Sequence, residues 1–217
     1  MRLKELESAL SGVKTFSQPK VELEQYPTSA HLAARMLHVA QENFGDIEDR
    51  CVADMGCGGG ILAIGACLLG ASHVVGFDVD ADALEIAASN ALEEEVDIEL
   101  IQADVQELGA GSSGIMLGNG EIPFDTIIMN PPFGTRQKSI DMAFVRTALS
   151  LSRESVYSLH KTSTREHIRR KAREWNVEAQ VVAEMRFDIP KMYKFHSQKS
   201  RDVAVDFWRI SKTWKRI

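Results

Sequence analysis

Short apolar runs alternate with longer stretches of helical periodicity along this chain. The apolar runs lie at residues 51–55, 73–77, 98–102, 124–129, 155–160, 177–187 and 203–210. Runs of this kind, rich in valine and isoleucine, are typical of strands that are buried in a sheet. Because these strands alternate with helices, the pattern predicts an α/β fold with a doubly wound sheet and helices on both of its faces.

Two helices can be delimited from their end residues. Leucines recur at helical spacing over residues 3–10 and Gly12 follows them, which predicts a short N-terminal helix that packs on the body. A second helix is predicted over residues 29–43, with Thr28 as its N-cap and Gly45 as its stop.

The length of 217 residues and the hydrophobic content of 44% fit one soluble globular domain. We expect its core over residues 28–210, preceded by the N-terminal helix and a loop (1–27) and followed by a tail (211–217). No apolar run approaches the roughly 20 residues that span a bilayer, and the charged start does not resemble a signal peptide. The sequence therefore predicts a soluble intracellular protein that does not enter a membrane. Three cysteines without a C-x-x-C pair predict reduced thiols and no bound metal.

Charge is distributed unevenly along the chain. Residues 1–132 hold 6 Lys and Arg against 22 Asp and Glu, a net charge of −16, whereas residues 133–217 hold 19 against 9, a net charge of +10. A basic half suits a polyanion such as a nucleic acid that approaches from one side. The alternative is a basic helix face that only contacts solvent.

A glycine-rich loop follows the first long apolar run and reads D-M-G-C-G-G-G over residues 54–60. Glycines let the backbone turn tightly and approach a ligand, and the helix behind them presents free N–H groups, so the loop predicts a nucleotide-type cofactor site. Two phosphate-binding interpretations are weakened: the sixth position of a dinucleotide fingerprint, counted from Gly56, is Ile61, and the Gly-Lys-Ser/Thr of a P-loop is absent. Asp54 instead favours a cationic ligand group such as an ammonium or a sulfonium.

Two further acidic residues follow predicted strands. Asp78 ends the second strand, 24 positions after Asp54, where a carboxylate can bind both hydroxyls of a ribose. The alternative is that Asp78 only caps the next helix, a role that Asp80 could also fill. Asp104 stands just past the third strand, so all three carboxylates are expected at the same edge of the sheet.

The motif F-D-T-I-I-M-N-P-P-F-G ends the fourth strand at Asn130. In open α/β sheets the ligand crevice lies outside the carboxyl ends of the strands, so Asn130, held by the rigid Pro131 and Pro132, is expected to face a site. The alternative is an ordinary strand exit in which the asparagine caps a turn.

Six stretches of the sequence resemble a known group of enzymes. They are E-Q-Y-P-T, A-D-M-G-C-G, F-D-V-D-A-D-A-L-E-I, I-M-N-P-P-F-G-T, Y-S-L-H-K and Y-K-F-H. The chain is similar to the class I S-adenosylmethionine-dependent methyltransferases, and within them to the methyltransferase-like protein five family, the N6-adenosine methyltransferases of small-subunit ribosomal RNA. The family loop usually carries a larger residue where this chain has Gly59.

The resemblance implies a Rossmann-like sheet of seven strands with an antiparallel last strand, and S-adenosyl-L-methionine as the cofactor. It implies that Gln25 and Thr28 contact the cofactor from a covering loop. It also implies cofactor contacts for Asp54, Gly56, Gly59 and Ile61 at the amino-acid end, for Asp78 at the ribose, and for Asp104 and Val105 at the adenine. It further implies a heterodimer with a small zinc-binding methyltransferase activator subunit along the third strand, and a place in the nucleus and cytoplasm.

The N-P-P-F residues fit transfer to an exocyclic adenine amine, which is a poor nucleophile because its lone pair is delocalised. The Asn130 side-chain oxygen and the Pro131 carbonyl can accept both amine hydrogens, which favours the tetrahedral nitrogen of the transition state. Phe133, which follows Pro132, would stack on the unpaired base. Neither a general base nor a metal is needed.

The basic half suggests where RNA binds. We expect phosphate contacts from a late irregular segment more than from the basic helix at 165–173, whose charges must point in several directions. The predicted RNA-binding residues are Lys191, Lys194, His196, Lys199 and Arg201. Two alternatives remain at this point: a protein glutamine methyltransferase, which shares the N-P-P loop, and a non-catalytic RNA-binding module.

Overall fold

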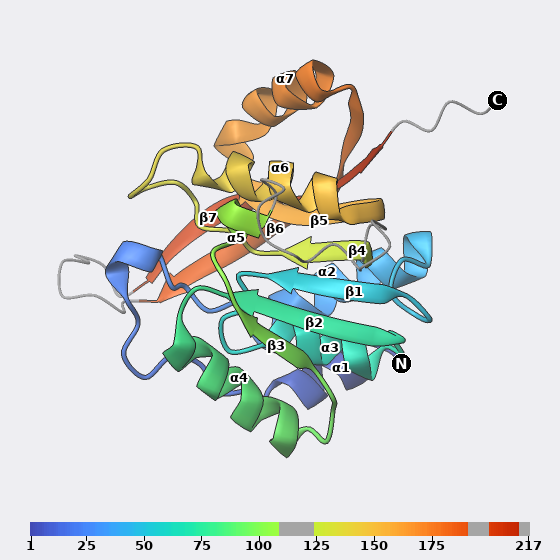
Figure 1. The fold of residues 1–217 in the computed structure, drawn as a ribbon, viewed down its shortest axis with the longest axis vertical. Coiled ribbons are helices and arrows are strands. Elements are labelled where there is room, and N and C mark those ends of the chain that lie inside the picture. The colour runs from blue at the N-terminus through green and yellow to red at the C-terminus, as the bar shows by residue number, and fades with distance from the viewer. Residues whose placement is uncertain (109–123, 191–199, 213–217) are drawn as a thin grey trace.

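The computed structural model describes residues 1–108, 124–190 and 200–212 (Figure 1). Within them, seven strands form one sheet in the order β3-β2-β1-β4-β5-β7-β6. The strands are β1 (Cys51–Met55), β2 (His73–Asp78), β3 (Glu99–Gln102), β4 (Phe124–Met129), β5 (Ser152–Lys161), β6 (Val177–Pro190) and β7 (Ser200–Lys212). Strands β1 to β5 pair in parallel, whereas β7 runs antiparallel to β5 and β6. The predicted α/β fold and the antiparallel last strand are confirmed.

Helices cover both faces of the sheet (Figure 1). One layer holds α1 (Leu3–Leu10), α2 (Ala30–Phe44) and α3 (Ile61–Leu68), with α4 (Ala81–Glu93) packed against β2 and β3. The other layer holds α5 (Val105–Leu108), α6 (Ile140–Leu151) and α7 (Arg165–Trp175). Neighbouring residues of a strand point to opposite faces, so Ile127 packs in the second layer and Ile128 in the first.

The strand order reverses between β1 and β4, which are hydrogen-bonded neighbours. The loops that leave these two strands therefore diverge and open a crevice at their carboxyl ends. The first carries the glycine-rich sequence and the second carries N-P-P-F. None of the helices in the described part of the chain has the length and apolarity that crossing a membrane requires.

Helix α1 matches the predicted residues 3–10, whereas α2 begins and ends one residue later than the predicted 29–43. Gly45 ends α2 in the left-handed conformation, as predicted. The N-cap of α2 is Ser29, whose side chain accepts from the Leu32 N–H, so the prediction of Thr28 as the cap was wrong by one residue. Thr28 does not cap the helix because its hydroxyl faces Asn130 instead.

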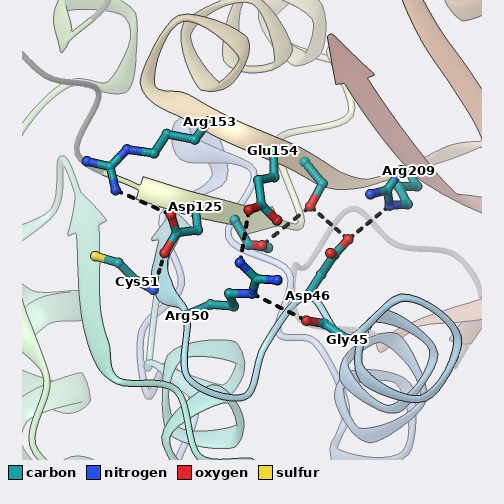
Figure 2. Close-up of polar contacts among 10 residues, drawn as sticks. Gly45, Asp46, Arg50, Cys51, Asp125, Arg153, Glu154 and Arg209 are labelled. Carbon is teal, nitrogen blue, oxygen red and sulfur yellow. Dashed lines mark hydrogen bonds and ion pairs between the residues drawn. The ribbon is translucent and has the colours of Figure 1, made fainter. Parts of the chain in front are cut away.

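A polar cluster ties the two halves of the sheet together at the opposite end from the crevice (Figure 2). The Asp46 carboxylate, which is buried in the loop between α2 and β1, accepts from Ser155 at 3.0 Å, Tyr157 at 2.7 Å and Arg209 at 2.9 Å. These donors lie on β5 and β7. The cluster therefore fixes the C-terminal strands to the N-terminal half of the fold.

Candidate functional site

The loop between β1 and α3 approaches the crevice with bare backbone. Gly56, Gly58 and Gly60 have positive φ angles of 73°, 54° and 84°, a conformation that disfavours any side chain. A Cβ at Gly59 would lie only 2.8 Å from the Lys14 carbonyl oxygen. The loop is thus closely covered by the N-terminal segment and has no room for side chains.

Two buried carboxylates stand beside this loop. Asp54 accepts from the Ala63 N–H at 3.1 Å through Oδ2, while no described residue hydrogen-bonds its buried Oδ1. Burial raises the pKa of Asp54 to about 8. Asp78 accepts from the Gly58 N–H at 2.8 Å and from the Asp80 N–H at 2.9 Å, and burial raises its pKa as well. Asp80 is the N-cap of α4, so Asp78 does not cap that helix, and its carboxylate contacts the glycine-rich loop instead.

A segment of residues 20–28, here called the covering segment, crosses the crevice from the β2 side. Lys20 donates to one oxygen of Asp80 at 2.6 Å and the Gln25 amide donates to the other at 2.7 Å. Although burial opposes it, the hydrogen bond from Lys20 holds the pKa of Asp80 below its usual value. Asp80 therefore anchors one end of the covering segment to the start of α4.

The other end of the covering segment contacts the N-P-P-F loop. Glu24 accepts from the Arg136 backbone N–H at 2.9 Å, and Thr28 Oγ1 accepts from Asn130 Nδ2 at 2.9 Å. The second carboxylate oxygen of Glu24 is buried, and no described residue hydrogen-bonds it. Two hydrogen bonds therefore join the covering segment to the loop that follows β4.

Asn130 stands at the end of β4 with its side-chain amide in the crevice. Its Nδ2 is paired with Thr28, whereas its buried Oδ1 has no hydrogen-bond partner among the described residues. A buried acceptor without a partner costs about 1–3 kcal/mol. Because Asn130 also lines the cavity, its unpaired oxygen is suited to a ligand that brings its own N–H or O–H group.

Phe133 lies beside the crevice and is half-buried. Its ring meets the Phe187 ring edge-on at 5.4 Å between centroids, and the Lys161 ammonium lies 5.3 Å from its centroid. The aromatic ring is therefore held in one orientation by residues of β5 and β6, as a surface on which a base stacks must be.

The crevice contains a cavity of about 250 Å³. Most of the predicted site residues line it: Gln25, Thr28, Asp54, Gly56, Gly59, Ile61, Asp78, Asp104, Val105, Asn130 and Pro132. Pro131 and Phe133 are not among the lining residues. Sequence reasoning missed Phe16, Glu24, Cys57, Val79, Arg136 and Phe144, which also line the cavity. The stretch E-Q-Y-P-T pointed to Glu24, but an acid in an irregular loop gives no periodic signal.

The predicted RNA-binding residues are not placed. Lys191, Lys194, His196 and Lys199 lie outside the described residues, as does the side chain of Arg201. On α7, Arg169 pairs with Glu166 at 2.6 Å and Lys171 pairs with Glu174 at 2.7 Å. Part of the positive charge of α7 is therefore balanced within the helix itself.

Behind the N-P-P-F loop, His160 is buried at the end of β5. Its Nε2 lies 2.8 Å from Ser158 Oγ and its Nδ1 lies 3.4 Å from an Asp141 oxygen at the start of α6. Although burial opposes it, the contact with His160 lowers the pKa of Asp141. His160 thus links the end of β5 to the start of α6.

Comparison with known proteins shows which family this chain is similar to. The family model described as ribosomal protein L11 methyltransferase (PrmA) matches residues 28–130. A protein of Danio rerio named rRNA N(6)-adenosine-methyltransferase METTL5 is 50% identical over 98% of this chain and 100% of its own length. A Drosophila melanogaster protein of the same name is 49% identical over 97% of this chain and 96% of its own length.

A solved structure gives the same fold over the full length. The Pyrococcus horikoshii protein PH1948 has a TM-score of 0.83 and 34% identity, and the match covers 100% of this chain and 99% of the other. With half of its residues identical to the zebrafish protein over nearly the whole length, the chain belongs to the METTL5 family of rRNA N(6)-adenosine-methyltransferases.

Proposed function

We propose that this protein transfers a methyl group from S-adenosyl-L-methionine to N6 of an adenosine in small-subunit ribosomal RNA. Two relatives that share about half of its residues are named rRNA N(6)-adenosine-methyltransferases, which supports the reaction and the class of RNA. The observation that carries the proposal is at Asn130, which lines the cavity and whose buried side-chain oxygen has no partner among the described residues.

The residues around the cavity fit the cofactor. Asp54 and Glu24 each have a buried oxygen that no described residue pairs, and these acceptors suit the ammonium and sulfonium charges of the cofactor. The closely covered glycine loop suits a ligand that contacts backbone N–H groups. The residues that would hold the cofactor are Gln25, Thr28, Asp54, Gly56, Gly59 and Ile61 at its amino-acid end, Asp78 at its ribose, and Asp104 with Val105 at its adenine.

The cofactor, when bound, supplies an electrophilic methyl group. The protein must then make the adenine amine a better nucleophile, and Asn130 Oδ1 with the Pro131 carbonyl would accept its two hydrogens. Acceptors so placed favour the tetrahedral nitrogen of the transition state over the planar ground state. Phe133, held by Phe187 and Lys161, would stack on the base and aim the nitrogen.

RNA would approach from the carboxyl ends of the strands. The net charge of +10 over residues 133–217 supports this, because these residues include both the loop after β4 and the segment between β6 and β7. We infer that Lys191, Lys194, His196, Lys199 and Arg201 contact the RNA backbone there.

The edge strand β3 supports the proposed heterodimer with a small zinc-binding methyltransferase activator subunit. Within the described residues, β3 pairs only with β2. Val79, just after β2, and Leu92, on the helix packed against β3, are 47% and 81% exposed. An unpaired strand edge with exposed apolar side chains beside it suits a partner that adds a strand. We place the complex in the nucleus and cytoplasm.

The alternative functions are not favoured. A protein glutamine methyltransferase would share the N-P-P loop, but the relatives at 49% and 50% identity are named for adenosine in rRNA. A non-catalytic module is not favoured because the same two relatives are named as methyltransferases.

The proposal is tested by mass spectrometry of nucleosides from small-subunit ribosomal RNA of cells that lack the protein. We expect N6-methyladenosine to be lost at one site and restored by the parent protein but not by Asn130→Ala. An unchanged nucleoside profile in the deleted cells would overturn the assignment. Cofactor binding by Asn130→Ala, measured by calorimetry, should stay close to that of the parent and shows that this variant is folded.

A further inference from the structure

The two ends of the Asn130 side-chain amide have different surroundings. The nitrogen donates to Thr28 Oγ1 at 2.9 Å, whereas the buried oxygen has no partner among the described residues. An acceptor for an amine must be the oxygen, because a side-chain NH₂ group turned toward the amine would oppose one donor with another. The activity therefore depends on which end of the amide faces the cavity.

The N-P-P sequence alone does not fix the orientation of the Asn130 side-chain amide. Pro131 and Pro132 restrict the backbone around Asn130, but rotation about the terminal χ2 bond of asparagine is broad and roughly two-fold. Some other group must hold the plane of the amide. Thr28 is the described residue that hydrogen-bonds it.

Thr28 is well placed for this role because its own position is fixed. It is buried and directly precedes Ser29, the N-cap of α2, so it is attached to a helix that packs in the core. Four residues earlier, Glu24 accepts from the Arg136 N–H at 2.9 Å and makes a second bridge to the same loop. The covering segment thus contacts the N-P-P-F loop at two points, and one of them is the side chain of Asn130.

We propose that Thr28 is a positioning residue for the methyl transfer: its hydroxyl holds the Asn130 amide with the oxygen toward the cavity. This inference rests on the proposed function and adds a role that is separate from contact with the cofactor. By accepting from Nδ2, the hydroxyl fixes the plane of the amide and leaves Oδ1 free for the amine of the substrate. In this orientation the amine of a bound adenosine can donate a hydrogen bond to Oδ1.

Removing the hydroxyl leaves both ends of the amide without a partner among the described residues. Thr28→Val keeps the branched shape and removes only the hydrogen bond, whereas Thr28→Ser keeps the hydroxyl and removes only the methyl group. Ser29→Ala is the matched control, because it removes a hydroxyl from the adjacent residue and weakens the cap of α2 without touching Asn130.

Kinetics on ribosomal RNA are measured with cofactor and RNA both saturating, so that altered cofactor affinity does not enter kcat. We expect kcat of Thr28→Val to fall about tenfold to a hundredfold, as the loss of one buried hydrogen bond at a reacting group predicts. Thr28→Ser should recover most of the loss, and Ser29→Ala should lower the melting temperature while kcat stays near the parent value. A parent-like kcat in Thr28→Val, with only cofactor affinity reduced, overturns the inference.

A second measurement does not require the RNA substrate. The side-chain amide protons of Asn130 are identified by NMR as the pair that disappears in Asn130→Ala. We expect them to shift and to exchange faster with solvent in Thr28→Val, but to stay in place in Thr28→Ser. Unchanged signals in Thr28→Val refute the positioning role. If the parent methylates no RNA adenine, the proposed function fails, while the amide signals still decide whether Thr28 holds Asn130.

Discussion

The side chain of Asn90 holds the backbone of Lys14 from both sides: Nδ2 donates to the Lys14 carbonyl oxygen at 2.9 Å and Oδ1 accepts from the Lys14 N–H at 3.0 Å. Nδ2 also donates to the Gly59 carbonyl oxygen at 2.8 Å. One buried side chain on α4 therefore joins the N-terminal segment to the glycine loop.

Asn90→Ala should destabilise the fold by about 2–3 kcal/mol, because it leaves buried backbone groups of two segments without partners. For a domain of this size the melting temperature should fall by roughly 2–4 °C per kcal/mol. Ser89→Ala, at the exposed neighbouring position, is the control and should melt with the parent. Equal melting temperatures for Asn90→Ala and the parent would contradict the bridging role.

Asp78→Ala should weaken cofactor binding by about 1.5–3 kcal/mol, because it removes a charge-assisted bidentate interaction with the ribose. The Asp78 carboxylate also accepts from the Gly58 and Asp80 N–H groups, so part of the effect will come from loosening of the loop. Asp78→Asn keeps one acceptor and should fall between the parent and alanine. Calorimetry measures the cofactor affinity of the parent and of both variants. Unchanged affinity in a folded Asp78→Ala would show that the ribose lies elsewhere.

Cofactor binding should release a proton from Asp54. Burial raises the pKa of this carboxyl from 3.8 to about 8, so it is largely protonated in the free protein at pH 7. A cationic ligand favours the ionised form. Affinity should therefore rise with pH up to about 8, and calorimetry in buffers of different ionisation enthalpy should detect the released proton. Asp54→Asn should abolish that release.

The same carboxyl links stability to pH in the absence of ligand. Because the folded pKa of Asp54 lies above the unfolded value, its contribution to stability is present at low pH and is lost as the pH rises from about 4 to about 8. Asp54→Asn should flatten the pH dependence of the melting temperature over that range. A variant whose curve runs parallel to that of the parent would show that Asp54 ionises freely in the fold.

Salt dependence of RNA binding should separate the segment between β6 and β7 from α7. Changing Lys191, Lys194, Lys199 and Arg201 to Ala should lower the log–log salt slope by about 0.9 for each duplex phosphate that is no longer neutralised, or about 0.7 on single strands. Changing Arg169 and Lys171 should have a smaller effect, because both are paired with glutamates of α7. Cofactor affinity should be unchanged in both variants. Equal slopes for the parent and the first variant would exclude this docking face.

Asp46→Ala should destabilise the fold by about 2–4 kcal/mol, since it leaves Ser155, Tyr157 and Arg209 without their shared acceptor. Arg50→Ala removes a half-exposed pair with Glu154 near the same place (Figure 2) and should cost under about 1 kcal/mol. The free energy of unfolding of both variants is measured by urea denaturation. A similar cost for the two variants would contradict the dominant role of Asp46.

The pattern of apolar runs was sufficient to predict the strands, because a buried parallel strand needs a run that is apolar on both faces. The run at Cys51–Met55 matches β1 residue for residue. The positions of Asp54, Asp78 and Asn130 followed in turn, since strand ends in such a sheet meet at one edge. These features depend on local pattern and on topology, both of which the sequence expresses directly.

The parts that escaped prediction depend on contacts between distant segments. Thr28 and Ser29 are both good caps, and the choice between them is made by Asn130, which lies 102 positions away in the chain from Thr28. Glu24 lines the cavity because the Arg136 backbone holds it there. The charges of α7 suggest a basic surface, whereas the glutamates one turn away balance some of them. None of these relationships leaves a periodic signal.

The carbonyl oxygen of Lys14 occupies the space where a side chain at position 59 would begin. A residue larger than glycine at that position is therefore incompatible with this path of the N-terminal segment. Gly59 and the path of the N-terminal segment therefore depend on each other: in a chain with a larger residue at position 59, that segment must lie further from the loop. Replacing Gly59 alone would displace the N-terminal segment, whose residues 13–16 form part of the cavity wall.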